Sequence, residues 1–164
     1  MQTIVAYAPK SDSDVMPEKM IMNIRPYQSE DESQVIDLWG GTVADAAAHN
    51  DPALAIRLKM TKDPQLFLVA TVDNTVAGTV MGGFDGHRGW LYSLAVASEY
   101  RRRGIATALV QRLEAELLEM GCLKVNLQVR GTNSDVLGFY EHAGYCVEDR
   151  VSLGKRLYDK EDEA

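Results

Sequence analysis

Residues 99–109 read EYRRRGIATAL, with three adjacent arginines and a glycine directly before an apolar helical repeat. Apolar residues recur every four positions from Ile105 to Leu117, and Gly121 stands where a helix of this length would be capped. The run WLYSLAV, residues 90–96, is apolar enough to form a central strand just before the arginines. The stretch therefore predicts a strand, a basic loop and a long helix in direct succession.

The basic loop has the properties of an anion site. The first N–H groups of a helix lack intrahelical partners, and the helix dipole makes that end electropositive. Gly104 has no side chain to block a ligand, and Ala106 is small, so neighbouring amides can turn toward one pyrophosphate. The alternative is a solvated basic turn, since runs of charge usually lie on the surface. The spacing matches neither G-x-x-x-x-G-K-[ST] nor G-x-G-x-x-G, the usual markers of nucleotide hydrolysis and dinucleotide binding.

The whole chain is acidic. Its 164 residues, 46% of them hydrophobic, suit one domain with its own core, and 17 Lys and Arg against 24 Asp and Glu give a net charge of −7. This balance disfavours nucleic acid and anionic membranes as partners and favours a cationic one. Cys122 and Cys146 lack metal-ligand spacing, so we expect no metal. Without a signal peptide or long apolar span, we expect buried, reduced cysteines in a cytoplasmic protein.

The rest of the chain predicts one α/β domain with a mixed sheet. Residues 1–21 show no sustained period and are interpreted as an N-terminal extension, with the domain over 22–164. Further strands are predicted over MNIRPY, LFLVATV, TVAGTVMGG, LKVNLQV and YCVEDRVSLGKRL, with a hairpin turn at Asp73-Asn74. Further helices are predicted over SEDESQVIDLWG, with Ser29 as N-cap, DPALAIRLKMTKD and NSDVLGFYEHAG.

Two motifs in this order resemble those of one enzyme family. RRRGIA, Arg101 to Ala106, is similar to the [Q/R]-x-x-G-x-[G/A] motif of the GNAT family of acetyltransferases. NSDVLGFYEHAGY, Asn133 to Tyr145, resembles the family's N-x6-Y-x3-G-[FY] segment. The likeness covers residues 22 to about 150, and two motifs in context are more specific than one. VAGTVMGGFDGHRGWLYSLAV and SLGKRL are most similar to one bacterial group of these acetyltransferases.

The resemblance implies a fold and a cosubstrate. The fold is a mixed, mostly antiparallel sheet of six to seven strands with about four helices, splayed between two parallel central strands. Those strands correspond here to WLYSLAV and LKVNLQV. Acetyl-CoA enters the gap between them, its pantetheine arm pairing with backbone and its phosphates held by loop amides. The residues so implied are Leu94, Val96, Arg101, Arg102, Arg103, Gly104, Ile105, Ala106, Thr107 and Asn133, the last of which also caps its helix.

Tyr140 is the catalytic residue that the family pattern implies. It shares a helix face with Asn133 and Leu137, at i, i+4 and i+7. As general acid it protonates the CoA thiolate, and its unperturbed pKa of about 10 keeps it protonated at neutral pH. The alternative is a half-buried core aromatic. Conservative removal of the hydroxyl distinguishes the two.

The general base is left open. Relatives that acetylate protein N-termini often carry glutamate where this chain has Gln128, which cannot take a proton at useful pH. The candidates are a water chain or Tyr92, Ser93, Asp85 and His87. His87 has a suitable unperturbed pKa but can equally be a polar turn residue. Glu99 is interpreted as a solvated turn residue, and neither His49 nor His142 has a partner pattern.

The sequence thus predicts an acetyl-CoA-dependent N-acetyltransferase that transfers directly to an amine, since neither cysteine lies beside a recognisable base. The acidic balance favours the amine of a small cationic molecule. The alternatives are a non-catalytic acyl-CoA-binding or regulatory domain and a protein N-terminal acetyltransferase. Residues 29–61 and the turn GGFDGHRG are expected to set acceptor specificity. Oligomeric state is open, a homodimer included.

Overall fold

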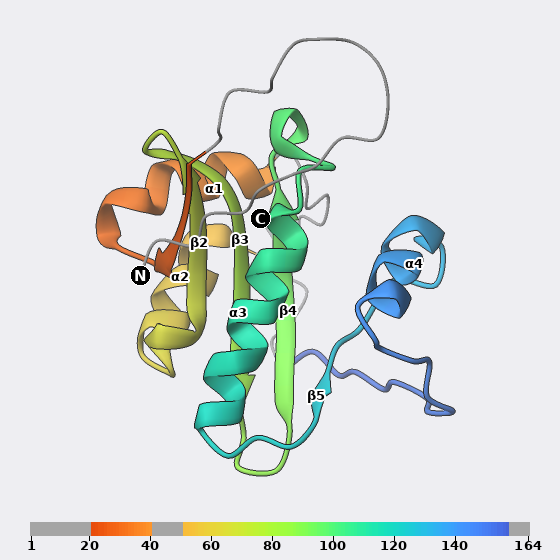
Figure 1. Cartoon of the computed structure of the whole chain (residues 1–164). Helices are drawn as coiled ribbons and strands as arrows, with labels where there is room; N and C mark the ends of the chain where they lie inside the picture. Colours follow the sequence, from red (N-terminus) through yellow and green to blue (C-terminus); the bar gives the residue numbers. More distant parts are fainter. Residues whose placement is uncertain (1–20, 41–50, 158–164) are drawn as a thin grey trace, which may run out of the picture.

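A computed structural model describes residues 21–40 and 51–157 and places a five-stranded sheet between helices (Figure 1). The strands lie side by side in chain order, β1-β2-β3-β4-β5. Nearly all of the predicted extension over 1–21 lies outside the described residues, as does His49. The division of the chain into an extension and a domain stays a prediction.

The first four strands form antiparallel neighbours. Both residues of the predicted turn between β2 and β3 have positive φ, 49° at Asp73 and 63° at Asn74, as a tight hairpin turn of this kind requires. The hairpin prediction is confirmed. The four strands are β1 (Met22–Pro26), β2 (Phe67–Val72), β3 (Thr75–Phe84) and β4 (Gly89–Val96).

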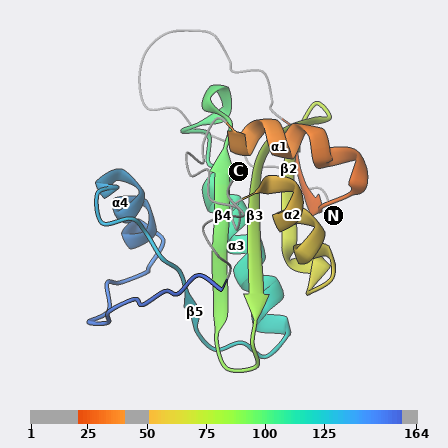
Figure 2. The ribbon, with the colours of Figure 1, turned by 180° about the vertical axis from the view of Figure 1, so that it is seen from behind.

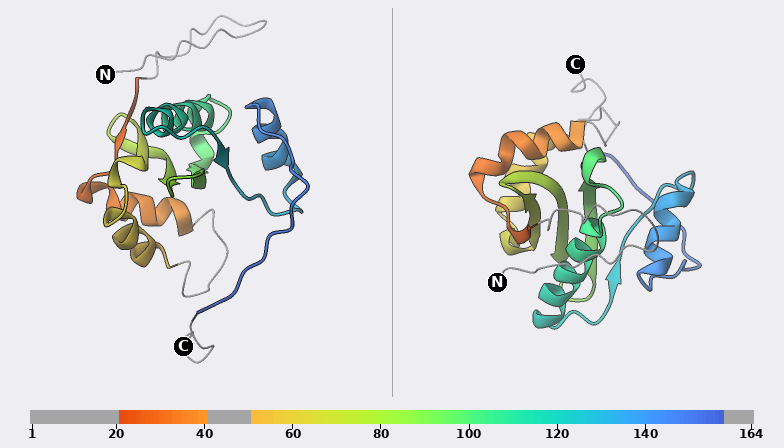
Figure 3. Two further views of the ribbon diagram at one scale, coloured as in Figure 1. Left: turned by 90° about the horizontal axis from the view of Figure 1, so that it is seen from below. Right: turned by 45° about the horizontal axis from the view of Figure 1, so that its top comes forward.

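Helices cover both faces of the sheet, as Figure 3 shows in its left view. On one face lies α3 (Ile105–Glu119), whose predicted apolar stripe is buried. On the other face lie α1 (Glu32–Gly40) and α2 (Pro52–Met60). Their buried side chains include Trp39, which packs on Phe67 and donates from Nε1 to Thr79 Oγ1 at 2.9 Å. Each face of the sheet thus has its own hydrophobic cluster.

The start of α1 differs from the sequence-based expectation. A 3-10 turn, η1 (Ser29–Asp31), precedes the helix, so Ser29 lies inside the first turn rather than capping it. The Gln28 N–H donates to Asp31 Oδ2 at 2.9 Å, and Arg25 donates to both Asp31 carboxylate oxygens at 2.6 and 2.8 Å. The buried Asp31 carboxylate organises this turn because it satisfies a backbone donor and a cation together.

Strands β4 and β5 run parallel and then separate (Figure 2). β5 (Val125–Asn126) pairs with β4 only at Gly89 and Trp90. Beyond this point β4 continues to Val96, while the chain leaves β5 for α4 (Ser134–His142), which stands to the side of the sheet. The predicted splay between these parallel strands is present, although the strand expected over LKVNLQV is only two residues long.

The prediction of a strand over YCVEDRVSLGKRL is wrong. No strand occurs between 143 and 157, and Val151, Leu153 and Leu157 are 86, 92 and 91% exposed. Apolar, β-branched composition favours a strand only where a neighbour completes the backbone ladder. This segment instead contacts the β5 region through side chains, including an ion pair between Lys124 and Glu148. The described residues therefore form five strands within the expected mixed architecture, rather than six or seven.

Two further sequence-based expectations concern the cysteines and membranes. Cys122 is buried as expected, but Cys146 is exposed because it lies in the segment without a sheet partner. Within residues 21–40 and 51–157, no helix is long and apolar enough to cross a membrane.

A third such expectation concerns metal ligands. In the same ranges, His, Cys, Asp and Glu side chains form no group of three that could hold a metal ion.

Candidate active site

The separation of β4 from β5 exposes one edge of β4. Within the described chain, no strand pairs with β4 on that side from Leu91 to Val96. Leu94 and Val96, both half-buried, lie on this free edge. Arg101 closes its far end by donating from Nε to the Val96 carbonyl at 3.2 Å. An extended ligand could pair here as an added strand, because backbone donors and acceptors are available.

A β-bulge interrupts β4 at the same place. Ala95 pairs with Thr79 and Tyr92 with Met81, so two residues of β4, Ser93 and Leu94, face one residue of β3. Ser93 has φ of 52°, and its carbonyl accepts a hydrogen bond from Thr79 Oγ1 at 3.3 Å. Bulges re-aim side chains and are frequent beside active sites. Nothing in the continuous run WLYSLAV indicates this bulge, so it was missed from the sequence.

The basic loop forms the open end of α3. It follows a 3-10 turn, η4 (Ser98–Tyr100), and leads to Gly104 at the N-cap with φ of 81°. The first intrahelical bond runs from the Ala108 N–H to the Gly104 carbonyl at 3.0 Å, so the three preceding N–H groups have no helical acceptor. These belong to residues 105–107. The predicted arrangement of amides at a helix start is therefore in place.

The surroundings of this helix start suit a pyrophosphate. A Cβ built on Gly104 would meet no atom within 4 Å, so the positive φ, rather than a neighbouring group, requires glycine there. Arg101, Arg102 and Arg103 all have exposed side chains, and Arg103 lies 5.6 Å from the centre of the Tyr100 ring. The loop thus combines free amides, open space and three cations.

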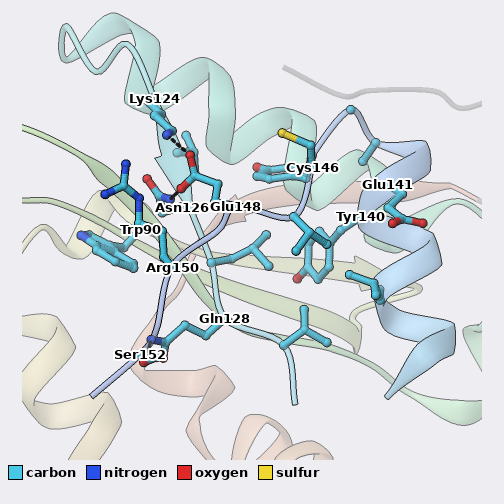
Figure 4. Close-up of a pocket in the computed structure, with 18 of the residues that line it drawn as sticks. Trp90, Lys124, Asn126, Gln128, Tyr140, Glu141, Cys146, Glu148, Arg150 and Ser152 are labelled. Carbon is cyan, nitrogen blue, oxygen red and sulfur yellow. Dashed lines mark hydrogen bonds and ion pairs between the residues drawn. The ribbon is translucent and has the colours of Figure 1, made fainter. Parts of the chain in front are cut away.

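Tyr140 points into a cavity from α4. Figure 4 shows its ring reaching away from the helix toward the continuation of β5. The residue is 6% exposed and packs edge-to-face on Phe139 and Tyr145, at 5.1 and 5.5 Å between ring centres. Burial raises the pKa of Tyr140 to about 12, so its hydroxyl stays protonated at neutral pH. Asn133 caps α4 by accepting from the Val136 N–H at 3.4 Å.

The cavity beside Tyr140 has a volume of about 1210 Å³ and lies between the β5 region, α4 and residues 143–152. Tyr145 ties the outer wall to α3, since its hydroxyl donates to Glu114 Oε1 at 2.7 Å. Glu148 accepts from Asn126 Nδ2 at 3.0 Å, while Asn126 Oδ1 is buried and lacks a partner among the described residues (Figure 4). The wall of the cavity therefore contains a buried hydrogen-bond acceptor beside β5 that the described residues leave unsatisfied.

A second cavity of about 920 Å³ lies on the α2 side of the sheet. Its walls come from the end of α1, from α2 and from the turn between β3 and β4, the regions that the sequence analysis associates with acceptor specificity. Trp90 and Gln128 line both cavities, so the two adjoin at the edge of β4. Two ligands could therefore approach β4 from opposite sides. The walls include Trp39, Lys59, Lys62, Asp63, Phe84 and Tyr92.

The base candidates differ in their surroundings. The Asp85 carboxylate accepts from the His87 and Arg88 N–H groups and from Trp90 Nε1, which lowers its pKa and makes it a weak base. His87 is exposed in the same turn. Tyr92 and Ser93 border the second cavity, and burial raises the pKa of Tyr92. The structure thus brings Tyr92 and Ser93 to the bulge, whereas Asp85 organises a turn.

Three other residues considered in the search for a base form local contacts. Glu99 is exposed and accepts from Ser98 Oγ at 3.1 Å, as expected of a solvated turn residue. His142 Nδ1 lies 2.6 Å from the Gly138 carbonyl within α4, and its side chain is exposed. Gln128 donates from Nε2 to Ser152 Oγ at 2.5 Å and occupies the wall shared by the two cavities.

Sequence analysis missed Lys59. It is only 6% exposed, and its Nζ donates to the Gly82 carbonyl at 2.5 Å and to the Lys62 carbonyl at 3.0 Å. Burial lowers the pKa of Lys59, an effect that the charge of Asp63 opposes and that of Lys62 reinforces. A signal was available, because Lys59 follows the buried Ile56 by three residues and so shares its helix face.

Comparisons with known proteins agree with this arrangement. The model of the family described as acetyltransferase (GNAT) matches residues 27–145. A protein of Yersinia pestis (strain Pestoides F) named acetyltransferase is 48% identical over 136 residues, covering 83% of this chain and 96% of its own. The fold resembles the Ard1 structure from Thermoplasma volcanium, with a TM-score of 0.70, 25% identity, and coverage of 77% of this chain and 84% of that one. It also resembles an aminoglycoside N-acetyltransferase solved with CoA, with a TM-score of 0.71, 15% identity, and coverage of 88% and 100%.

Proposed function

Since this chain belongs to the GNAT family of acetyltransferases, we propose that it transfers an acetyl group from acetyl-CoA directly to the amine of a small molecule. Three observations support the proposal. These are the unpaired edge of β4 beyond Trp90, the open helix start at Gly104, and Tyr140 in a cavity that reaches the β4 edge at Trp90. That the protein uses an acyl-CoA follows from its family. That the transferred acyl group is acetyl is part of the proposal.

The chain's own groups would hold acetyl-CoA at two places. The amides of residues 105–107 and the surrounding loop would bind the pyrophosphate, with the three arginine side chains adding positive charge. The β4 edge at Leu94 and Val96, where Arg101 already binds the Val96 carbonyl, would pair with the pantetheine arm, and Asn133 would contact the same region from the start of α4. When bound, the cosubstrate supplies an activated acetyl thioester.

In the transfer, the amine nitrogen bonds to the acetyl carbon and the carbon–sulfur bond breaks. The amine loses a proton, and the departing thiolate gains one. Tyr140 is the proposed donor, because its raised pKa keeps the hydroxyl protonated and its ring faces the cavity beside β5. Water held near Ser93 and Tyr92 would accept the amine's proton at the bulge and pass it to solvent, because the raised pKa of Tyr92 keeps its own hydroxyl protonated.

The second cavity is the proposed acceptor site. It adjoins the first cavity at Trp90 and Gln128, so an amine bound there could reach an acetyl group held along β4. The net charge of −7 favours an acceptor that is a cation in solution, as a small protonated amine is. Position 128 favours a small molecule over a protein N-terminus as acceptor. This chain has glutamine there, whereas relatives that acetylate protein N-termini often have glutamate.

A thiol-release assay tests the proposal. The full chain is mixed with acetyl-CoA and, one at a time, with a panel of polyamines, aminoglycosides and amino acids, and free thiol is measured alongside the mass of any acetylated product. Release that depends on an amine and yields an N-acetyl product of that amine is expected. Tight acetyl-CoA binding without release by any amine would instead identify a non-catalytic acyl-CoA-binding domain.

A further inference from the structure

Lys59 is a buried cation without an anionic partner in the described part of the chain. Its two acceptors are the backbone carbonyls of Gly82 and Lys62, and none of the ion pairs between described residues includes it. Two charged groups act on it in opposite directions, Asp63 raising its pKa and Lys62 lowering it, and burial outweighs both. A buried charge without a counter-ion is costly, whereas an apolar residue beside Ile56 would pack there without that cost.

The ammonium has capacity for one more acceptor. Three N–H donors are available on a lysine, and two are used. The Tyr92 hydroxyl donates to the same Gly82 carbonyl at 3.4 Å, so this hydroxyl lies close to the Lys59 ammonium. Lys59, Lys62 and Tyr92 all line the second cavity. A ligand in that cavity can therefore meet a cation that forms no ion pair with a carboxylate of residues 21–40 or 51–157.

We propose that the acceptor carries a carboxylate as well as its protonated amine, so that it is a zwitterion rather than a net cation, and that Lys59, assisted by Lys62, binds the carboxylate. This inference rests on the proposed function, since it names the class of acceptor. The carboxylate accepts the third N–H of the Lys59 ammonium and supplies the missing negative charge. The walls of the cavity also include apolar surface from Trp39, Leu58 and Trp90, which suits a methylene chain.

The position of Lys59 along the sheet sets the length of that chain. Gly82 pairs with Leu91, whereas the bulge in β4 lies at Ser93 and Leu94. Two to three strand residues separate the two places, a distance of about 7 to 10 Å at roughly 3.3 Å per residue. An α-amino group, one carbon from its carboxylate, spans only part of that distance from Lys59. The acceptor class is therefore an ω-amino carboxylate, with amine and carboxylate at opposite ends of a chain of several methylene groups.

Kinetics with matched acceptors test this class. The acceptors are a series of ω-amino acids from glycine to aminooctanoate, each paired with its primary amide, which keeps the amine and removes the charge. We expect kcat/KM to be highest at an intermediate chain length, with the carboxylate form preferred over its amide by about tenfold or more. Equal rates for acid and amide at every length would overturn the inference while leaving the N-acetyltransferase activity in place.

Substitution of Lys59 tests whether this lysine causes the preference for the carboxylate acceptor over its amide. Lys59→Met keeps the length and apolar stem of the side chain. In this variant the ratio of kcat/KM for the carboxylate acceptor to kcat/KM for its amide should fall to about one. Arg57→Met is the matched control, because Arg57 is exposed on the same helix and does not line the cavity. A ratio in Lys59→Met that equals the parent ratio would contradict the assignment to Lys59.

Binding of hexanoate provides a readout that requires neither catalysis nor acetyl-CoA. Hexanoate should bind the parent protein in a calorimetric titration, while hexanamide and the Lys59→Met variant with hexanoate should show at least about tenfold weaker binding. Hexanoate binding in a protein that acetylates no amine would support the carboxylate site and refute the proposed function. Equal binding of hexanoate and hexanamide to the parent would refute the carboxylate site, whether or not amines are acetylated.

Discussion

Tyr140 is packed as a core residue but has an unused hydroxyl. Its ring contacts two aromatic neighbours, and among the described residues no group forms a hydrogen bond with its oxygen. A tyrosine that served packing alone could be a phenylalanine at little cost, since the oxygen stabilises nothing in the protein. The free hydroxyl facing the cavity is therefore the feature that links this residue to chemistry.

Replacing Tyr140 by Phe tests that link. The ring and its packing remain, so the free energy of unfolding should change by less than about 0.5 kcal/mol. If the hydroxyl protonates the departing thiolate, kcat on a good acceptor should fall roughly 10²- to 10⁴-fold, the usual effect of a positioned acid. Acetyl-CoA affinity should change much less, because the thioester needs no proton in the ground state. Full turnover in the variant would assign the proton to another group or to water.

Gly104 tests whether backbone or side chains hold the pyrophosphate. With φ of 81° and open space around its Cα, valine at this position forces the loop to change conformation and turns its amides away. Gly104→Val should therefore weaken acetyl-CoA binding by about tenfold or more. Gly104→Asn should weaken acetyl-CoA binding less, because asparagine tolerates positive φ. Isothermal titration calorimetry on folded variants measures both.

Arg102→Ala is the matched side-chain variant. It keeps a Cβ at a position whose φ is already 62°, so the backbone preference changes little. Because the side chain is exposed and screened by water and salt, its loss should weaken acetyl-CoA binding less than Gly104→Val does. The reverse order of losses would show that arginine side chains, rather than amides, provide most of the affinity.

At the scale of elements, the link between β1 and α1 depends on Asp31. Burial by itself raises the pKa of Asp31, but hydrogen bonds from Arg25 and the Gln28 N–H outweigh burial and lower it. A lowered pKa in the folded state stabilises the protein above the unfolded pKa of about 3.9, and this stability is lost as pH falls through the folded pKa. Acid should therefore loosen the connection of this helix to the sheet.

Asp31→Asn measures that contribution. The amide keeps the size of the side chain but not the charge that Arg25 contacts, so the free energy of unfolding at pH 7 should fall by about 1–3 kcal/mol. The difference between parent and variant should be constant above about pH 5 and shrink below about pH 4, where the carboxylate is protonated first in the unfolded chain and then, as pH falls through the lowered pKa, in the folded protein. Urea unfolding across this range provides the values. A difference that does not depend on pH would contradict the role of the carboxylate charge.

At the scale of the whole molecule, three tyrosines in different parts of the fold resist ionisation. Burial raises the pKa values of Tyr27 and Tyr140 to about 12, with Glu32 adding to the effect at Tyr27. Burial and the hydrogen bond to Glu114 also raise the pKa of Tyr145. Together these residues connect the α1 side of the sheet, α3 and the segment after α4.

Alkaline pH should therefore unfold the protein as a whole. Because these hydroxyls ionise more easily in the unfolded chain, their contribution is complete below about pH 10 and is lost as pH rises from 10 toward 12. The free energy of unfolding should fall over this interval, and the tyrosinate absorbance of these three residues should appear together with the loss of circular dichroism. In Tyr140→Phe the decline should be shallower. Complete tyrosine titration before unfolding would contradict this prediction.

Local patterns in the sequence were sufficient for the order of elements as far as α4 and for the start of α3. The glycine of RRRGIA directly precedes the predicted helix, the Asp73-Asn74 turn forms the expected hairpin, and the four-residue repeat from Ile105 is buried. Both motifs of the GNAT resemblance fall within the matched range 27–145. These features depend on backbone preferences and periodicities that neighbouring residues encode, so they can be read without the fold.

The tertiary structure alone decided what depends on partners distant in the chain. The bulge at Ser93 arises from the register between β3 and β4, the gap arises where β5 leaves β4, and the unpaired segment after α4 exposes Cys146. Lys59 becomes a recognition group only because β3 brings the Gly82 carbonyl to α2. Strand pairing, cavity formation and the burial of a charge are set by which surfaces meet, and a lysine or serine has the same local pattern in either environment.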